Sequence, residues 1–351
     1  MIVYLVMLVI SLFFASCAGR IRDVQECRNS YRVFTVLSFL PFFIVSAIRY
    51  QIGTDWPIYD EYFYAINSGT NEFKEPIFNL VNKIIYALSK DSQWLFVISA
   101  LQGLSFLFMA VYKQSKYIPF SLLIFFFSTF YFNSLNQIRQ GIAMCIFLYA
   151  YQYVRQENWK KYFIWIIVAA GFHISALVYL SVYILYKWKA EIKKHIIAFV
   201  VILACMPVLK VLLVKVISLT SYGWYFDSVY ASNDFSLAGF LISLLILVLH
   251  EYYLTLGQEE DKSYSCMVNM QLLCVIVLLC TGFIPQVSRV ASAFEIISIL
   301  SLPKMVLREK DRNRRIVVYI LITLLLVVKL VYNVYICGFF DVIPYQTIFS
   351  K

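Results

Sequence analysis

The chain has 351 residues, of which 62% are hydrophobic and only 14% are charged, and its formal net charge is +10. A soluble domain is nearer half apolar and a quarter charged, so one water-soluble core cannot hold this apolar mass. The composition excludes an ordinary soluble protein and predicts one dissolved in lipid, whose positive charge lies in cytoplasmic loops rather than at a nucleic-acid site.

Long apolar runs without polar alternation predict an all-α, polytopic transmembrane bundle rather than a β-barrel. A spanning helix needs about 20 apolar residues. In chain order, the clear candidates are residues 1–19, 33–48, 94–112, 117–133, 138–154, 196–217, 236–254, 266–284 and 315–336. Shorter candidates are residues 286–302 and 162–187, the latter a hairpin of two short helices that breaks near Gly171 to Ser175. Together these segments predict about 11–13 spanning or hairpin helices.

The distribution of Lys and Arg orients the chain in the membrane. No positive segment precedes the first apolar run, and Arg20 and Arg22 follow it, which predicts a retained first helix. The helix that Glu75 and Pro76 open, residues 76–90, is ambiguous because it carries several polar side chains. If it lies outside along the interface, six inside loops hold 20 of the 30 Lys and Arg residues. The positive-inside rule favours this topology, with the N- and C-termini outside.

This topology gives a single integral membrane domain, residues 1–351. Residues 49–93 form a long extracytoplasmic loop with an interfacial helix, and residues 219–235 form a second extracytoplasmic loop. Long loops are often functional. The outer side therefore receives a set of charged candidates, namely Arg49, Asp55, Glu75, Arg139, His173 and Arg289.

The segment Asn136-Gln137-Ile138-Arg139-Gln140 is a polar stretch between two strongly apolar helices. An arginine at a helix N-terminus opposes the helix dipole, and a bound anion would relieve that opposition. A helix N-terminus and a guanidinium group both attract phosphate. Charged residues inside a membrane are functional candidates by default, so we expect Arg139 to bind an anion, with Asn136 and Gln140 in support.

Three other positions carry candidate chemistry on the outer side. Arg49 closes an apolar helix six residues before Asp55, as either a snorkelling interfacial residue or part of an anion site. His173 lies at the expected hairpin tip, where an imidazole can act as a general base near neutral pH. Arg289 opens another helix, and Glu295 follows on that helix, where a carboxylate needs a partner or a proton.

Several kinds of site are missing from the sequence. The eight cysteines lie mostly in apolar runs, with no CxxC pair and no Cys/His spacing suited to a metal. No glycine-rich phosphate loop and no DxD motif is found. We therefore expect no metal, no cofactor and no ATP coupling in this chain.

The polar motifs resemble those of the EpsG family, the Wzy-like polymerases of bacterial exopolysaccharide, capsule and O-antigen. Order and spacing agree over roughly residues 1–300. The motifs are Arg49-x3-Gly53-Thr54-Asp55-x3-Tyr59, Glu75-Pro76, Asn136-x2-Arg139-Gln140-x2-Ala143 and Phe172-His173-x-Ser175-Ala176, with Arg289 as the late arginine. The Asn-x-x-Arg-Gln and Phe-His-x-Ser elements are the most specific.

The resemblance implies a GT-C-like membrane glycosyltransferase of the bacterial cytoplasmic (inner) membrane. Its donor and acceptor would be oligosaccharide repeats on undecaprenyl diphosphate, polymerised at the outer face of that membrane, and a chain-length regulator would be a further partner. It implies that Arg49, Arg139 and Arg289 hold the diphosphate. His173 would be a base or a positioning group, and Asp55 or Glu75 would orient the acceptor.

Other functions stay open at this point. A lipid-linked oligosaccharide flippase or transporter would also be rich in helices and internal cations, but it usually shows internal repeats and discontinuous helices near the midplane. An O-acyltransferase would also combine a membrane bundle with a histidine. An O-antigen-type ligase is the nearest alternative, because it uses the same donor and differs only in its acceptor.

Overall fold

The computed structural model describes residues 1–70, 72–220, 222–228, 231, 235–256 and 261–350. Within these ranges the chain is helical, apart from one isolated bridge between Arg49 and Thr347, which confirms the all-α prediction. Seven described helices are long and apolar enough to span a membrane, or eight if one bent pair counts as a span. The helices form two compact units, Met1–Leu180 with Arg312–Lys351 and Ser181–Asp311.

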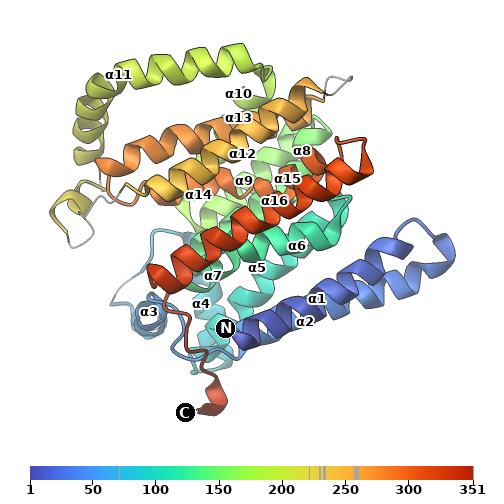
Figure 1. Cartoon of the computed structure of the whole chain (residues 1–351). Coiled ribbons are helices and arrows are strands. Elements are labelled where there is room, and N and C mark those ends of the chain that lie inside the picture. The colour runs from blue at the N-terminus through green and yellow to red at the C-terminus, as the bar shows by residue number, and fades with distance from the viewer. Residues whose placement is uncertain (71, 221, 229–230, 232–234, 257–260, 351) are drawn as a thin grey trace. The chain divides into compact units, whose positions relative to one another are not determined.

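The first unit contains ten α-helices within its described residues. Figure 1 shows α1 and α2 as an antiparallel pair, and α8 packs against both α5 and α9. The helices are α1 (Ile2–Ile21), α2 (Arg28–Ala47), α3 (Trp56–Ser68), α4 (Pro76–Leu88), α5 (Gln93–Gln114), α6 (Ile118–Phe127), α7 (Phe130–Asn136), α8 (Ile138–Arg155), α9 (Trp159–Phe172) and α16 (Arg312–Leu330). The long helices agree with the expected runs to within a few residues, except where a run is broken.

Both chain ends lie at the same end of this unit (Figure 1). Tyr4, in the first turn of α1, donates its hydroxyl to the carbonyl oxygen of Val342 at 3.1 Å. The hydroxyl of Tyr345 donates to the carbonyl oxygen of Val45 at 2.8 Å. The C-terminal segment thus packs beside the end of α2, directly before Arg49. That this end faces outward stays a prediction.

The expected hairpin within residues 162–187 forms at His173. Helix α9 ends at Phe172, His173 is extended, and the 3₁₀ helix η2 (Ile174–Ser181) follows. The Tyr162 hydroxyl donates to the carbonyl oxygen of Tyr179 at 2.7 Å, which joins the two arms. Gly171 lets α9 approach α4 closely, because a Cβ there would lie 2.4 Å from Cδ1 of Ile77. The hairpin therefore brings His173 to the start of α4.

Three segments are divided differently from the sequence-based expectation. The single helix expected over residues 117–133 is broken into α6 and α7 with a bend of 57°, because Thr129 adopts a left-handed φ of 71°. The run 286–302 is divided into α14 (Ser288–Glu295) and α15 (Ser298–Val306). The loop 49–93 holds two helices, α3 and α4, where one interfacial helix was expected.

The second unit holds the remaining α-helices of the described residues. Helix α13 supplies more buried residues to this unit than any other helix, whereas the buried residue of α11, which contains Pro207, is His195. The expected second outer loop falls partly outside the described residues, at 221, 229–230 and 232–234. Besides α14 and α15, the helices are α10 (Val182–Lys187), α11 (Ile192–Ser218), α12 (Leu237–Thr255) and α13 (Lys262–Leu279).

Candidate functional site

Glu75 is the centre of a polar cluster built from three distant segments of the first unit. It immediately precedes Pro76, the first residue of α4, and its carboxylate is 4% exposed. Arg139, in the first turn of α8, donates from Nη1 to Oε2 of Glu75 at 2.6 Å. The α9–η2 turn supplies Nδ1 of His173 at 3.1 Å and the backbone N–H of Ile174 at 3.3 Å, both to Oε1. The fold thus assembles an acid, a guanidinium and an imidazole from motifs that are separated along the chain.

These contacts fix the charge of Glu75. Burial by itself would raise the pKa of the carboxyl, but the His173 hydrogen bond and the Arg139 charge outweigh it and lower that pKa to about 2. The group is therefore a carboxylate near neutral pH and can only accept hydrogen bonds. Nδ1 of His173 must then carry a proton, and in a neutral imidazole this leaves the lone pair on Nε2.

Arg139 is enclosed by aromatic rings without being sealed from solvent. Its guanidinium carbon lies 3.8 Å from the centroid of the Phe73 ring, and Tyr62 stacks on Phe73 at 4.4 Å. Tyr59 also hydrogen-bonds the Arg139 side chain. The Arg139 side chain is 22% exposed, and its Nε has no hydrogen-bond partner among the described residues. Arg139 can therefore accept an anion besides Glu75.

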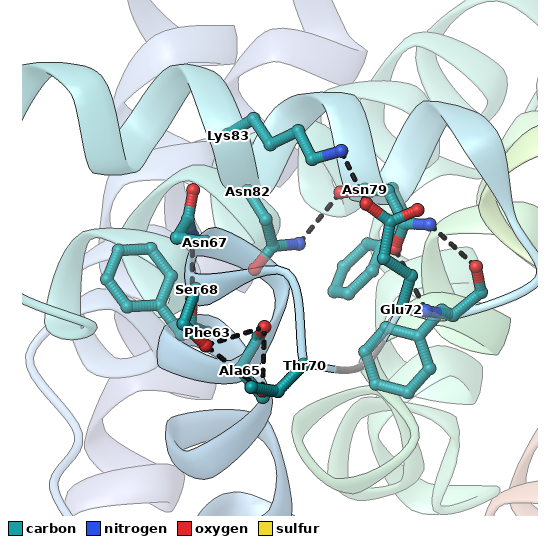
Figure 2. A network of polar contacts seen from close by, with 11 residues as sticks. Phe63, Ala65, Asn67, Ser68, Thr70, Glu72, Asn79, Asn82 and Lys83 are labelled. Carbon is teal, nitrogen blue, oxygen red and sulfur yellow. Dashed lines mark hydrogen bonds and ion pairs between the residues drawn. The ribbon is translucent and has the colours of Figure 1, made fainter.

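Asn79 holds Phe73 in this position. Its Nδ2 donates to the carbonyl oxygen of Phe73 at 2.6 Å, and its Oδ1 accepts from the Phe73 N–H at 3.2 Å. Figure 2 shows Asn79 beside Lys83 and Glu72, whose side chains form an exposed ion pair. Asn82 lies one turn further along α4 and donates within its own helix, to the carbonyl oxygen of Phe78 at 2.7 Å.

Asn136 fixes the loop that carries Asp55. Its Oδ1 accepts from Oγ1 of Thr54 and from the backbone N–H of Asp55, both at 2.8 Å. Gly53 makes this approach possible because it adopts a φ of +102°, and a Cβ there would lie 3.3 Å from the Leu135 carbonyl oxygen. Asp55 is consequently held at the N-terminus of α3.

Arg49 is 2% exposed. Its Nη1 donates to the carbonyl oxygens of Leu135 and, at 3.4 Å, Ile52, and its guanidinium carbon lies 5.2 Å from the centroid of the Phe96 ring. In this conformation Arg49 ties the loop after α2 to the end of α7. The predicted contact of Arg49 with diphosphate stays a prediction.

The remaining expected residues are distributed over both units. Gln140 is buried in the first turn of α8. Arg289 is the second residue of α14 and Glu295 the last, both in the second unit, so the expected meeting of three arginines also stays a prediction. Among the described residues, no group of three His, Cys, Asp or Glu side chains could hold a metal ion.

Sequence reasoning missed Phe73 and Asn79. Asn79 could have been found, because it lies four residues after Glu75 and therefore on the same face of α4. Phe73 carries no comparable signal, because one aromatic residue among many does not stand out. The second unit also contains a buried polar pair, in which Nδ1 of His195 contacts Oε1 of Glu251 and Nε2 lies 2.7 Å from Oδ1 of Asn269.

Comparison with curated proteins and with solved structures found no match. The sequence pattern of one protein family does match, over residues 32–347 of the 351. The match spans Glu75, Arg139 and His173, and it extends beyond residue 300, where no motif was recognised. On this match, the chain belongs to the EpsG family.

Proposed function

We propose that this chain polymerises oligosaccharide repeat units that are linked to undecaprenyl diphosphate, at the outer face of a bacterial cytoplasmic membrane. EpsG-family membership suggests a membrane protein of the polysaccharide polymerase type. The observation that carries the finer proposal is the Glu75 carboxylate held between Arg139 and His173. This cluster combines an oriented base with an accessible cation, the two groups that such a glycosyl transfer needs.

His173 is the proposed general base. Because Glu75 holds the proton on Nδ1, Nε2 presents a lone pair to the hydroxyl group of the acceptor sugar. As that oxygen forms a bond to the anomeric carbon of the donor, its proton passes to Nε2. The His173 side chain is 19% exposed, which leaves an edge for the substrate. Glu75 orients this imidazole and stabilises the imidazolium that forms.

Arg139 is the proposed electrostatic partner of the leaving group. The bond from the anomeric carbon to the phosphate oxygen breaks, and its electron pair leaves with the lipid diphosphate. A guanidinium group that is already in place stabilises the negative charge developing there. Its unpartnered Nε and 22% exposure support this role. The glycosyl–diphosphate bond supplies the free energy, so ATP has no part in the proposal.

The other site residues have secondary roles in this proposal. Asp55, held by Asn136, would orient the acceptor, and Gln140 would support the first turn of α8. Arg289, with Glu295 on the same helix, would contribute a second cation to the diphosphate. The proposed mechanism requires no metal and no cofactor. Both substrates are lipid-linked. A chain-length regulator is the proposed additional partner.

Deletion of the gene separates this function from its alternatives. The expected result is surface glycan reduced to single repeats, because export continues while polymerisation stops. Loss of all outer-leaflet repeats would instead identify a flippase. Full-length polymer that stays on its lipid would identify a ligase. Either of these outcomes overturns the proposal.

The site is tested with purified enzyme and lipid-linked repeats. Arg139→Lys keeps the positive charge but lacks the planar guanidinium group with its paired N–H donors. We therefore expect a reduced rate of polymerisation and shorter polymer. Arg155→Ala is a matched control, since Arg155 is an exposed residue at the other end of α8. Full polymer length with both Arg139→Lys and Arg139→Ala would remove Arg139 from the mechanism.

A further inference from the structure

A small cavity lies inside the first unit, behind the loop that follows α2. Its volume is about 30 Å³. Arg49 forms part of its wall, together with residues from α2, α5, α6, α7 and α8. Its polar side chains are Arg49 and three serines, Ser46, Ser99 and Ser134.

Two polar atoms of residues that line this cavity have no hydrogen-bond partner among the described residues. They are Nε of Arg49 and Oγ of Ser99, and both residues are at least 96% buried. Buried hydrogen-bond donors are seldom left unpaired, because each costs about 1–3 kcal/mol. Since an arginine Nε can only donate, its missing partner must be an acceptor.

The charge of Arg49 is unbalanced as well. Burial lowers the pKa of Arg49, but only to about 10, so the side chain is cationic at neutral pH. Its contacts are carbonyl oxygens and an aromatic ring, and no Asp or Glu lies among the described residues that line the cavity. A buried charge without a counter-charge is strongly destabilising.

The surrounding backbone favours an anion too. Ile138, Gly141 and Ile142, from the first two turns of α8, line the cavity. The N-terminal end of an 18-residue helix carries partial positive charge. Its N-cap residue, Gln137, provides no side-chain cap. The helix end therefore adds to the positive potential of Arg49.

The volume decides which anion fits. By the same measure one water needs about 10–15 Å³, so the cavity has room for a halide ion or about two waters, and none for a diphosphate. We propose that Arg49, Ser99 and the N-terminal end of α8 form a buried site for a small monovalent anion of halide size, with chloride as its occupant. The site is separate from the Glu75 cluster and does not depend on the proposed polymerase reaction.

Halide titration of the purified full-length protein tests this proposal. Thermal unfolding is followed as chloride or bromide replaces gluconate, which is too large for the cavity, at constant ionic strength. At ten times the dissociation constant, a ligand shifts the folding equilibrium about tenfold. For a chain of this size that corresponds to a rise in Tm of about 2 °C. A Tm that is the same in chloride and gluconate overturns the proposal and indicates water in the cavity.

Variants assign any halide effect to this cavity. Ser99→Ala should move the halide midpoint about tenfold higher, because one donor to the anion is lost. Ser298→Ala is the matched control: Ser298 Oγ is also buried without a partner among the described residues, but it does not line this cavity. Arg49→Met should abolish the response if the variant folds. An equal Tm response to halide in wild type, Ser99→Ala and Ser298→Ala would refute the assignment of the halide effect to this cavity.

A bromide-soaked structure gives an independent readout. The expected result is an anomalous peak within hydrogen-bonding distance of Nε of Arg49 and Oγ of Ser99. Peaks found only elsewhere on the protein, in crystals where the cavity density is explained by water, would overturn the site. Neither readout uses polymerase activity, so failure here is distinguishable from failure of the proposed function.

Discussion

Replacing Glu75 with glutamine should separate the two tasks of the carboxylate. The amide oxygen can still accept from Arg139, but the amide nitrogen can only donate. Facing Nδ1 of His173, it would force that nitrogen to accept, and the imidazole proton would move to Nε2. Glu75→Gln therefore keeps the shape of the site while presenting the wrong tautomer to the acceptor sugar.

The stability cost follows from the charge of Glu75. Its carboxyl pKa is lowered from 4.5 to about 2 in the folded protein, and each unit is about 1.4 kcal/mol. The carboxylate thus contributes about 3 kcal/mol, present in full above about pH 4.5 and lost as the pH falls through the folded value near 2. Because glutamine is never ionised, Glu75→Gln should remove about this amount at neutral pH. Its Tm should be lower than that of wild type by several degrees.

The catalytic cost is a separate quantity. Loss of a correctly protonated general base lowers rates by about 10²–10⁴. We expect this fall in kcat for Glu75→Gln, with KM for the lipid-linked substrates changed much less. The measurement is the initial rate of polymer formation by purified protein, with the folded fraction determined in the same preparation.

A matched substitution controls for loss of one negative charge. Glu61 is an exposed residue on α3, and Glu61→Gln should stay within about 0.5 kcal/mol and twofold of wild type. If Glu75→Gln polymerised at the wild-type rate, His173 would not be an oriented base. If it lost activity only in proportion to its folded fraction, Glu75 would be structural alone.

Three further predictions concern the surroundings of the site. Asn79→Ala should release Phe73 and raise KM for the lipid-linked substrates by about fivefold, which corresponds to about 1 kcal/mol for the lost hydrogen bonds. The control Asn82→Ala should change Tm more than KM. Equal effects of the two variants on KM would contradict the role of Asn79 in holding Phe73. Gly171→Val should push α9 away from α4 and lower Tm by the equivalent of about 1–3 kcal/mol, and an unchanged Tm would refute the close packing. Lys83→Cys, in a chain without other cysteines, should react with a membrane-impermeant maleimide from outside, and labelling only from inside would reverse the proposed topology.

Most of the helical framework was predictable because lipid imposes a simple rule. Backbone groups in lipid must be paired within the helix, so each long apolar run becomes one. The breaks were harder to find. The bend between α6 and α7 depends on a left-handed threonine at position 129, which no local pattern indicates. Helix α3 is short and amphipathic, so neither the length rule nor the hydropathy rule detects it.

The titratable members of the candidate site were predictable from the sequence, but their pairings were not. Glu75, Arg139 and His173 were each identified from polar residues at helix ends. Which acid contacts which base depends on long-range packing, such as the approach of α9 to α4 at Gly171. Arg49 illustrates the same limit, because its sequence position is equally consistent with a snorkelling side chain and with the buried one observed.

The packing of helix α11 depends on the surrounding lipid. None of the residues in its 18-residue apolar window is buried against the described residues of its unit, although the helix is 27 residues long. Lipid tails are therefore the neighbours that α11 requires, and an amphiphile that surrounds it poorly will loosen this helix before it affects the packed core. Hydrogen exchange along α11 should report the quality of a detergent or nanodisc preparation earlier than Tm does.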